Sequence, residues 1–172
     1  MKTVYLGLGS NLGDRERMLQ NALDALASPR LHIRRVSPVY ETEPMDVAAQ
    51  PWFLNAVAEA ETDLFPLQLL QRAQRVEAQL GRRRTTPKGP RSIDIDILLF
   101  GKFIVQTPVL EIPHPRFRER RFVLAPLAGL APDLRDPVTG KTIRELLAKV
   151  TGQAARKVDL QIIVPRIQLE LD

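Results

Sequence analysis

Cysteine is absent from this chain of 172 residues, and aromatic residues make up only 5% of it. The absence of cysteine excludes disulfide scaffolds, zinc–thiolate sites and cysteine nucleophiles. No stretch approaches the roughly 20 apolar residues of a membrane span. The short apolar run at the N-terminus reaches the polar pair Ser10-Asn11 too early for a signal peptide. We therefore expect a soluble, cytoplasmic protein that has no membrane partner.

Basic residues outnumber acidic ones, 25 to 20, which gives a net charge of +5. They concentrate in 82–91 and 114–121. A general nucleic-acid binder would interleave such residues with aromatic side chains, which are scarce here. We therefore expect a small, phosphate-rich ligand and no nucleic-acid partner. The length and the 44% hydrophobic content are sufficient for one compact domain with its own core.

The stretch 81–100 joins a basic loop to a strand that carries two carboxylates. Isoleucine and aspartate alternate within 93–97, so Asp94 and Asp96 share the strand face opposite the isoleucines. Their α-carbons would lie about 6.6 Å apart, which lets both bind one or two hard cations. Anion-binding side chains beside metal ligands indicate phosphoryl chemistry. The basic residues of the loop are Arg82, Arg83, Arg84, Lys88 and Arg91.

The order of the expected elements favours an α+β fold of ferredoxin-like type. In this fold an antiparallel sheet carries helices on one face and the active site on the other. Strands are expected at 2–9, 31–42, 53–62 and 93–97, helices after Asp14, after Pro66, and at 121–130 and 142–150, and a small hairpin within 101–112. Pro38 predicts an edge or a bulge in the second strand.

Glycines stand at positions 7 and 9, near the end of the expected first strand, and at position 13 after it. A dinucleotide-binding fingerprint is disfavoured, because the third glycine has the wrong offset and no acidic residue follows where a ribose partner is expected. We interpret the glycines as a structural turn between strand and helix. The stretch 43–52 loses periodicity and contains two prolines, which predicts an active-site loop.

Several polar residues leave two interpretations open. Asn55 lies on a strand between apolar neighbours and would need hydrogen-bond partners, which a planar, amide-rich ligand could supply. Gln74 and Glu77 lie one helical turn apart, where an exposed polar face is the simpler reading. His32 is interpreted as a surface residue. His114 favours anion binding, because four arginines follow it: Arg116, Arg118, Arg120 and Arg121.

Four motifs together resemble the 6-hydroxymethyl-7,8-dihydropterin pyrophosphokinase family. They are GSNLGD at 9–14, PWFLN at 51–55, GPRSIDIDILLFG at 89–101, and IPHPR at 112–116 followed by RFVLAPL at 121–127. The third motif is specific in combination with the others, whereas the Asp-x-Asp pattern alone is weak. The resemblance covers roughly residues 2–150. We therefore expect a single pyrophosphokinase domain at 1–150 and a tail at 151–172, whose role is unassigned and in which 158–164 is rich in β-forming residues.

The resemblance implies that diphosphate is transferred from ATP to the pterin hydroxymethyl group, giving AMP, in folate biosynthesis. It also implies two Mg²⁺ ions, held by Asp94 and Asp96, and assigns the catalytic role to Arg82 and Arg91. We expect the protein to be a monomer. ATP would be bound by Gln74, Glu77, Arg84, Ile97, His114 and Arg120. The pterin would be bound by Thr42, Pro44, Met45, Phe53, Asn55 and Phe122.

The chain departs from its relatives in the basic loop, where Lys88 replaces an aromatic residue and the loop is one residue shorter. Two other functions use similar features. A basic ferredoxin-like RNA-binding module would carry stacking aromatics on its sheet, where this chain has Asp94, Asp96 and Asn55. A metal-dependent nuclease could use paired aspartates but would need an evident base or further acidic ligands. The pyrophosphokinase interpretation accounts for more of the sequence than either.

Overall fold

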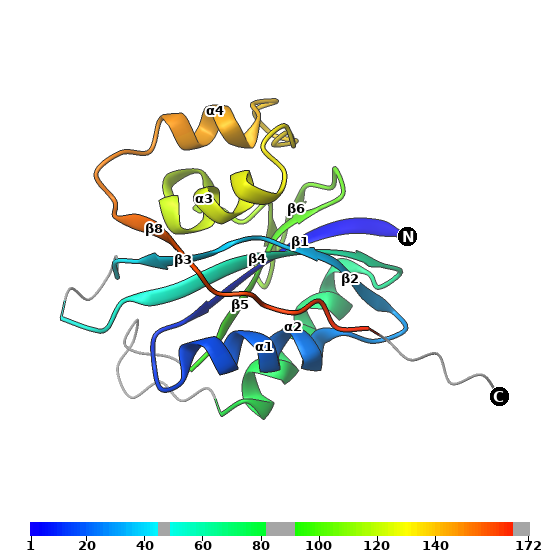
Figure 1. Cartoon of the computed structure of the whole chain (residues 1–172). Helices are drawn as coiled ribbons and strands as arrows, with labels where there is room; N and C mark the ends of the chain where they lie inside the picture. Colours follow the sequence, from blue (N-terminus) through cyan, green and yellow to red (C-terminus); the bar gives the residue numbers. More distant parts are fainter. Residues whose placement is uncertain (45–48, 82–91, 167–172) are drawn as a thin grey trace.

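In the computed structural model, which describes residues 1–44, 49–81 and 92–166, a six-stranded sheet forms the centre of the protein (Figure 1). All its strand pairs are antiparallel. The elements are β1 (Lys2–Ser10), α1 (Arg15–Leu26), β2 (Leu31–Val36), β3 (Val39–Thr42), β4 (Phe53–Thr62), α2 (Pro66–Gln79), β5 (Asp94–Phe100), β6 (Val105–Gln106), β7 (Glu111–Ile112), the 3₁₀ helix η1 (Phe117–Glu119), α3 (Arg121–Leu130), α4 (Ile143–Ala148) and β8 (Ala155–Val158).

The strand order is β5-β1-β4-β3-β8, and β2 also pairs with β4. β1 therefore lies between β4 and β5, paired with β4 along its whole length and with β5 over most of it. The hairpin expected within 101–112 is present as a separate two-stranded sheet, β6-β7. The α+β class is confirmed.

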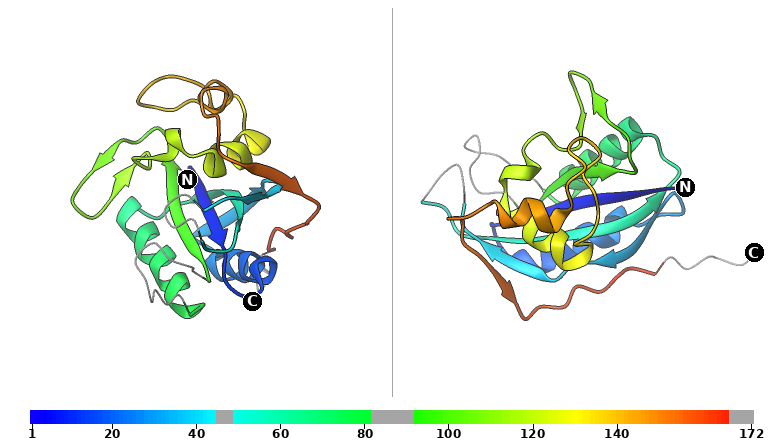
Figure 2. Two further views of the ribbon diagram at one scale, coloured as in Figure 1. Left: turned by 90° about the vertical axis from the view of Figure 1, so that its left-hand side faces the viewer. Right: turned by 90° about the horizontal axis from the view of Figure 1, so that it is seen from above.

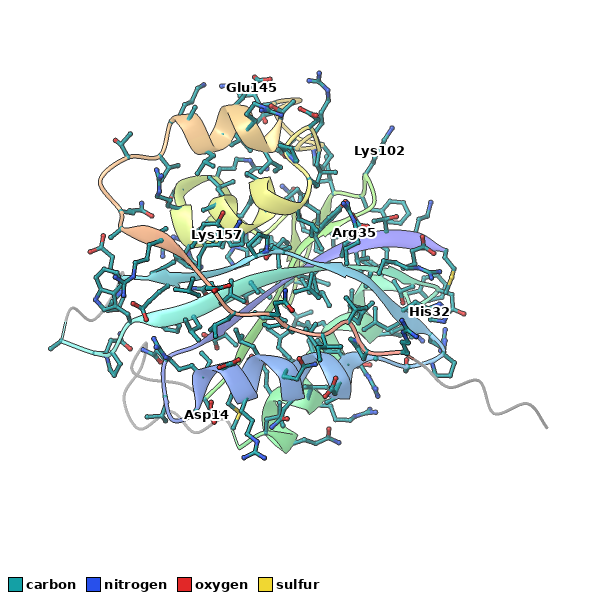
Figure 3. The ribbon with its side chains drawn as sticks, viewed as in Figure 1. Asp14, His32, Arg35, Lys102, Glu145 and Lys157 are labelled. Atoms are coloured by element: carbon teal, nitrogen blue, oxygen red, sulfur yellow. The ribbon has the colours of Figure 1, made fainter. Side chains whose placement is uncertain are left out.

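One face of the sheet is closed by α1 and α2, which pack against β1, β4 and β5. α1 begins where expected, directly after Asp14 (Figure 3). The Asp14 side chain caps the helix by accepting a hydrogen bond from the Arg17 amide at 3.1 Å. Its apolar stripe, including Leu19 and Leu23, is fully buried. Burial of this stripe, rather than helix propensity, accounts for most of the stability of such a helix.

The opposite face carries α3 and α4, so helices lie on both faces rather than on one (Figure 2). These helices bury a second core that includes Tyr5, Val57 and Leu98 from the sheet. The expectation of helices on a single face holds for α1 and α2 and is wrong for α3 and α4. The apolar residues of 121–130 need a hydrophobic partner, and this end of the second face provides it.

The strand expected at 31–42 is divided into β2 and β3 at Ser37-Pro38. Pro38 has no amide hydrogen and cannot continue the ladder. Ser37 compensates locally, because its amide donates to the Val57 carbonyl and its hydroxyl accepts from the Val57 amide, both at 2.8 Å. The break separates β2 from β3, whose last residue Thr42 lines the site described below.

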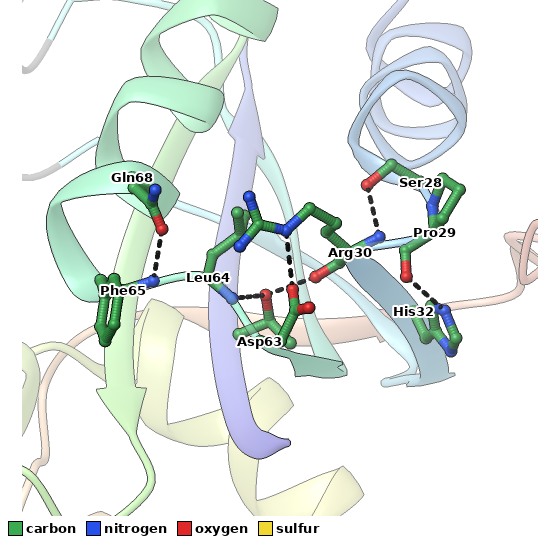
Figure 4. Close-up of polar contacts among 9 residues, drawn as sticks. Ser28, Pro29, Arg30, His32, Asp63, Leu64, Phe65 and Gln68 are labelled. Carbon is green, nitrogen blue, oxygen red and sulfur yellow. Dashed lines mark hydrogen bonds and ion pairs between the residues drawn. The ribbon is translucent and has the colours of Figure 1, made fainter.

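Polar contacts join the turn before β2 to the turn after β4 (Figure 4). Arg30 Nε donates to Asp63 Oδ1 at 2.9 Å, and the Arg30 carbonyl accepts from the Thr62 hydroxyl. His32 is half-buried at the start of β2, and its Nε2 lies 2.8 Å from the Pro29 carbonyl oxygen. His32 thus has a local structural partner.

After α4 the chain returns along the sheet, where β8 pairs with β3. The strand lies at Ala155–Val158, earlier than the β-rich stretch 158–164, and the following residues run beside α1 (Figure 1). There the Gln20 side chain makes two hydrogen bonds to the backbone of Ile163, both at 2.9 Å. Among the described residues, no helix is long and apolar enough to cross a membrane.

Candidate active site

A cavity of about 410 Å³ opens on the sheet face opposite α1 and α2, beside the end of α3. Its size is in the range of small-molecule sites. Strands β1, β4 and β5 form its floor, and the segments around β3, η1 and β8 form its walls. The lining residues are Gly7, Leu8, Gly9, Thr42, Glu43, Gln50, Phe53, Asn55, Ala56, Val57, Asp94, Asp96, Arg116, Glu119, Arg120, Phe122, Val123 and Gln153.

The floor is a trough whose centre is made of two glycines of β1. Gly9 pairs with Asn55 on β4 and with Asp94 on β5, so these three residues form one row across the sheet. Neighbouring strands lie about 4.8 Å apart, so the α-carbons of Asn55 and Asp94 stand roughly 10 Å apart. Gly9 contributes no side chain to the space between them, and the Asn55 amide leans over it. A flat ring with a charged substituent fits a trough of this shape.

Gly7 and Gly9 thus belong to strand β1, within the expected strand 2–9, rather than to the turn between strand and helix. The turn comes later, at Gly13, whose φ of +73° favours glycine. A Cβ added to Gly9 would lie 2.6 Å from Asn55 Oδ1, closer than real Cβ contacts come. A glycine at this position keeps the Asn55 side chain in its place.

Asn55 forms the polar end of the trough on β4. Its Nδ2 donates to Thr42 Oγ1 at 2.5 Å, and both side chains are buried. Because this bond uses one amide hydrogen, the Asn55 carbonyl oxygen and the Thr42 hydroxyl hydrogen keep hydrogen-bonding capacity. Phe53 lies two residues earlier on the same face and supplies an aromatic wall.

Asp94 and Asp96 form the acidic end of the trough on β5. Both are half-buried and line the cavity, while Ile95 between them is buried in the core on the other face. The predicted alternation is confirmed. Within residues 1–44, 49–81 and 92–166, no group of three or more His, Asp or Glu side chains could hold a metal ion. Two carboxylates supply hard oxygen ligands of the kind that Mg²⁺ takes alongside water and substrate phosphates, so this donor set fits that ion.

The arginines after His114 divide into two groups. Arg116 and Arg120 line the cavity, and the Arg120 guanidinium lies 5.4 Å from the centre of the Phe122 ring. Arg118 instead forms an ion pair with the buried Asp136, and Arg121 donates to the Val150 carbonyl at 3.0 Å. Arg118 and Arg121 are thus bound outside the cavity, whereas Arg116, which also lies 3.8 Å from the Glu119 carboxylate, and Arg120 line it.

His114 lies beside the same end of the cavity. Its amide donates to the Leu98 carbonyl at 3.1 Å, and its Nδ1 accepts from the Arg116 amide at 3.2 Å. Burial lowers the pKa of His114, the charge of Asp96 opposes that shift, and Arg120 and Arg116 add to it. The protonation of His114 is thus influenced both by the carboxylate of Asp96 and by the guanidinium groups of Arg116 and Arg120.

The other predicted residues are distributed around this centre. Gln74 is exposed on α2, whereas Glu77 is buried and its Oε2 accepts from the Ile95 amide at 3.1 Å. Ile97 is buried in the core between the sheet and α2. Pro44 is half-buried directly after the lining residues Thr42 and Glu43. The predictions for Met45, Arg82, Arg84, Lys88 and Arg91 lie outside the described residues.

The residues predicted for the site did not include the lining residues Gly9 and Gln153. Glu43 and Gln50 were not named singly but fall within the predicted active-site loop 43–52. Gln50 accepts a hydrogen bond from the Asn11 side chain at 2.8 Å, which links the first family motif to the start of the second. Gln153 comes from the tail, where no motif marks it. A glycine on the expected polar face of a strand was a usable signal for Gly9; for Gln153 the sequence contained none.

A family model for 7,8-dihydro-6-hydroxymethylpterin-pyrophosphokinase (HPPK) matches residues 5–132. The 2-amino-4-hydroxy-6-hydroxymethyldihydropteridine pyrophosphokinase of Pseudomonas aeruginosa is 46% identical over 149 residues, which cover 86% of this chain and 91% of that protein. The protein of the same name from Methylorubrum extorquens is 44% identical over 160 residues, covering 92% of this chain and 100% of that protein.

Other relatives are much longer than this chain. The folic acid synthesis protein of Schizosaccharomyces pombe is 44% identical over 156 residues, which are 90% of this chain and 21% of that protein. This chain thus spans about a fifth of the length of that relative. A crystal structure of Plasmodium falciparum HPPK-DHPS with pteroate is similar at a TM-score of 0.69 and 18% identity, covering 86% of this chain and 42% of that one. At this identity the likeness concerns the fold.

Proposed function

Because the chain belongs to the 7,8-dihydro-6-hydroxymethylpterin-pyrophosphokinase family, we propose that it transfers diphosphate from ATP to 6-hydroxymethyl-7,8-dihydropterin and releases AMP, as a step of folate biosynthesis. The observation that carries the proposal is the row Asn55–Gly9–Asp94. It combines an amide group and a carboxylate at opposite ends of one trough in the sheet. Such a trough can hold a flat heterocycle at one end and a metal-bound phosphate chain at the other.

The pterin is proposed to lie over Gly9 with its amide-like edge toward Asn55 and Thr42. The Asn55 carbonyl oxygen would accept from the ring N–H and amino groups, and the Thr42 hydroxyl would donate to a ring acceptor. Phe53 and Phe122 both line the cavity and would contact the ring faces. Pro44 and Met45 would contact the pterin from the adjoining loop, although Met45 lies outside the described residues.

Asp94 and Asp96 are proposed to hold two Mg²⁺ ions together with the phosphates of ATP. When bound, the ions would neutralise phosphate charge and favour ionisation of the attacking hydroxyl. The protein's own part is to keep two carboxylates on one rigid strand, backed by the bond from Ile95 to Glu77. Asp94 and Asp96 thereby remain next to the place where the hydroxymethyl group of the pterin would lie.

Cationic side chains are proposed to hold the phosphate chain and to balance the charge that develops during transfer. Arg120 would bind phosphate from the η1 side as a cation. His114, whose Nδ1 accepts from the Arg116 amide, would add a hydrogen bond from Nε2 as a neutral donor. Arg82 and Arg91, assisted by Arg84, would act on the moving diphosphoryl group from the basic loop, which lies outside the described residues. Transfer would then depend on alignment and electrostatic stabilisation rather than on a general base.

The adenosine part of ATP is proposed to bind at the edge formed by α2 and β5. Gln74 is exposed there, while Glu77 and Ile97 are buried at the contact of the two elements. In this arrangement Glu77 would hold strand β5 at the adenosine-binding edge, and Ile97 would pack below the adenine base. ATP would therefore extend from this edge toward Asp94 and Asp96.

An AMP-release assay tests the proposal. Purified protein is incubated with ATP, Mg²⁺ and 6-hydroxymethyl-7,8-dihydropterin, and the nucleotide products are separated. We expect one AMP for each pterin diphosphate, and no AMP when either the pterin or Mg²⁺ is omitted. ADP in place of AMP, or AMP release independent of the pterin, would refute the proposed function.

A further inference from the structure

Residues 153–158 lie beyond the segment 5–132 that the family model matches, yet Gln153 lines the cavity and Ala154 bonds to Glu43 in its wall. We propose that this segment, the C-terminal clasp, sets the distance between the two walls that hold the pterin, and that Gln153 is its positioning residue. The inference rests on the proposed function, since it assigns the clasp to the affinity for that substrate.

Gln153 holds the wall that carries Arg120 and Phe122. Its Oε1 accepts from the Arg121 amide at 2.9 Å, and its Nε2 donates to the Glu119 carbonyl at 2.9 Å. The amide side chain thus makes two hydrogen bonds to the backbone, one on each side of Arg120. Because a single side-chain amide satisfies both, it restrains the turn from η1 to α3 as a unit.

The next residue, Ala154, holds the opposite wall. Its amide donates to Glu43 Oε1 at 2.8 Å, and its carbonyl accepts from the Glu43 amide at 3.2 Å. Glu43 lines the cavity directly after Thr42, which accepts the hydrogen bond from Asn55. A displacement of Ala154 would therefore move Glu43, and through Glu43 the adjacent Thr42 that is hydrogen-bonded to Asn55.

Two consecutive residues thus join both walls, and consecutive α-carbons are about 3.8 Å apart. The width of the cavity on this side is consequently set by one peptide unit rather than by side chains that rotate freely. A planar ring held between the Thr42 side and the Phe122 side would lose affinity if the unit were loosened, because the walls would have to be ordered on binding.

The clasp is itself anchored to the sheet. β8 pairs with β3 from Ala155 to Val158, and Arg156 forms an ion pair with Glu41, which also pairs with Arg15 at 3.1 Å. The Glu41 side chain is only 16% exposed, which favours these pairs over typical surface pairs. The pairing of β8 with β3 and the ion pair between Arg156 and Glu41 fix the position of residues 153 and 154 relative to the sheet.

The test compares Gln153→Ala with Lys157→Ala. Lys157 lies in the same segment but is exposed on β8 and lies outside the cavity lining (Figure 3). For Gln153→Ala we expect KM for the pterin to rise roughly tenfold, which matches the loss of two backbone hydrogen bonds, with a smaller change in KM for ATP and in kcat. Exchange of the Arg121 amide should accelerate about tenfold. Lys157→Ala should leave all four quantities within about twofold.

Gln153→Glu is the conservative variant, since it keeps an acceptor for Arg121 and loses the donor to Glu119. Its KM for the pterin should lie between wild type and Gln153→Ala. The clasp is refuted if exchange at Arg121 is unchanged in Gln153→Ala, or if exchange accelerates while KM for the pterin stays at the Lys157→Ala value. Failure of the proposed function is recognised separately, because the wild-type protein would then release no pterin-dependent AMP.

Discussion

The two faces of the central sheet are built from the same strands and differ completely in what covers them. On the face beneath α1 and α2, buried residues such as Leu6, Leu8 and Ile95 form one continuous apolar core. On the opposite face the apolar core under α3 and α4 extends over one part of the sheet, and the cavity occupies the rest. Along one strand, therefore, residues that face the apolar core contribute to stability, and the residues between them face the cavity and are available for ligand binding.

This division predicts that substitutions on neighbouring residues will have separable effects. The side chain of Leu8 packs in the core, whereas Gly9 faces the cavity. In the same way the side chain of Leu54 packs in the core and that of Asn55 faces the cavity. On the closed apolar face, truncation of a buried side chain leaves a cavity and lowers the free energy of unfolding. On the open face, polar and like-charged groups lie close together, which costs some stability. The following substitutions test the separation, beginning with the largest expected effect.

Asp96→Ala should lower pterin-dependent AMP release by at least about a thousandfold, which corresponds to roughly 4 kcal/mol in the activation barrier. The free energy of unfolding should not fall, because the variant removes one of two adjacent like charges. Steady-state assays and chemical denaturation measure both quantities. Asp63→Ala is the control, since Asp63 is an exposed carboxylate paired with Arg30 away from the cavity. Substantial turnover by Asp96→Ala would contradict the metal-binding role.

Leu23→Ala should have the opposite profile. Leu23 is fully buried under the sheet, so its truncation should cost about 3 kcal/mol in the free energy of unfolding. The kcat/KM of the folded variant, measured well below its melting temperature, should stay near the wild-type value. Leu23→Met conserves volume and should cost less than about 1.5 kcal/mol. A large loss of activity in the folded Leu23→Ala protein would show that the faces are coupled.

Asp136→Asn tests the apolar part of the second face. Burial raises the pKa of Asp136, but hydrogen bonds from Arg118, Thr139 and the Val138 amide outweigh it and lower the pKa to about 2. Because the folded-state pKa lies below the unfolded value of about 3.9, the ionised group stabilises the protein above that pH, and the contribution is lost as the pH falls toward 2.

At pH 7 this contribution amounts to roughly 2 kcal/mol. We expect Asp136→Asn to be destabilised by about this amount at pH 7 and to show a flatter loss of stability between pH 5 and 2. Urea denaturation across this range measures it. Asp133→Asn serves as the matched control, because Asp133 pairs with Arg144 in solvent. If the free energy of unfolding of Asp136→Asn fell between pH 5 and 2 as steeply as that of the wild type, groups other than Asp136 would determine the loss of stability in acid.

Gly9→Ala should raise KM for the pterin roughly tenfold, which is the smallest of these effects, and change stability by less. The added methyl group would displace Asn55 Oδ1, because its carbon would lie only 2.6 Å from that oxygen. Gly7→Ala is the comparison, since its Cβ would meet the flexible end of Leu98 at 3.3 Å and leave Asn55 in place. An equal rise in the pterin KM in both variants would contradict the claim that Gly9→Ala acts by displacing Asn55.

The elements with strong periodicity were predictable from the sequence. Strand 53–62, the helix capped by Asp14 and the alternation around Asp94 and Asp96 are confirmed, and the family match confirms the resemblance that the motifs indicated. The break at Pro38 was predicted as an irregularity, but its position as a boundary between two strands depends on how Ser37 bonds across to Val57.

Local spacing along the chain is sufficient to place two carboxylates on one strand face, because side chains alternate with a period of two wherever a strand forms. It is not sufficient to place Asn55, Gly9 and Asp94 in one row, because strand register joins residues that are far apart in sequence. The same holds for Gln153, whose role depends on the return of β8 to the edge of β3. The acidic pair is a property of the sequence, and the trough and its clasp are properties of the packed sheet.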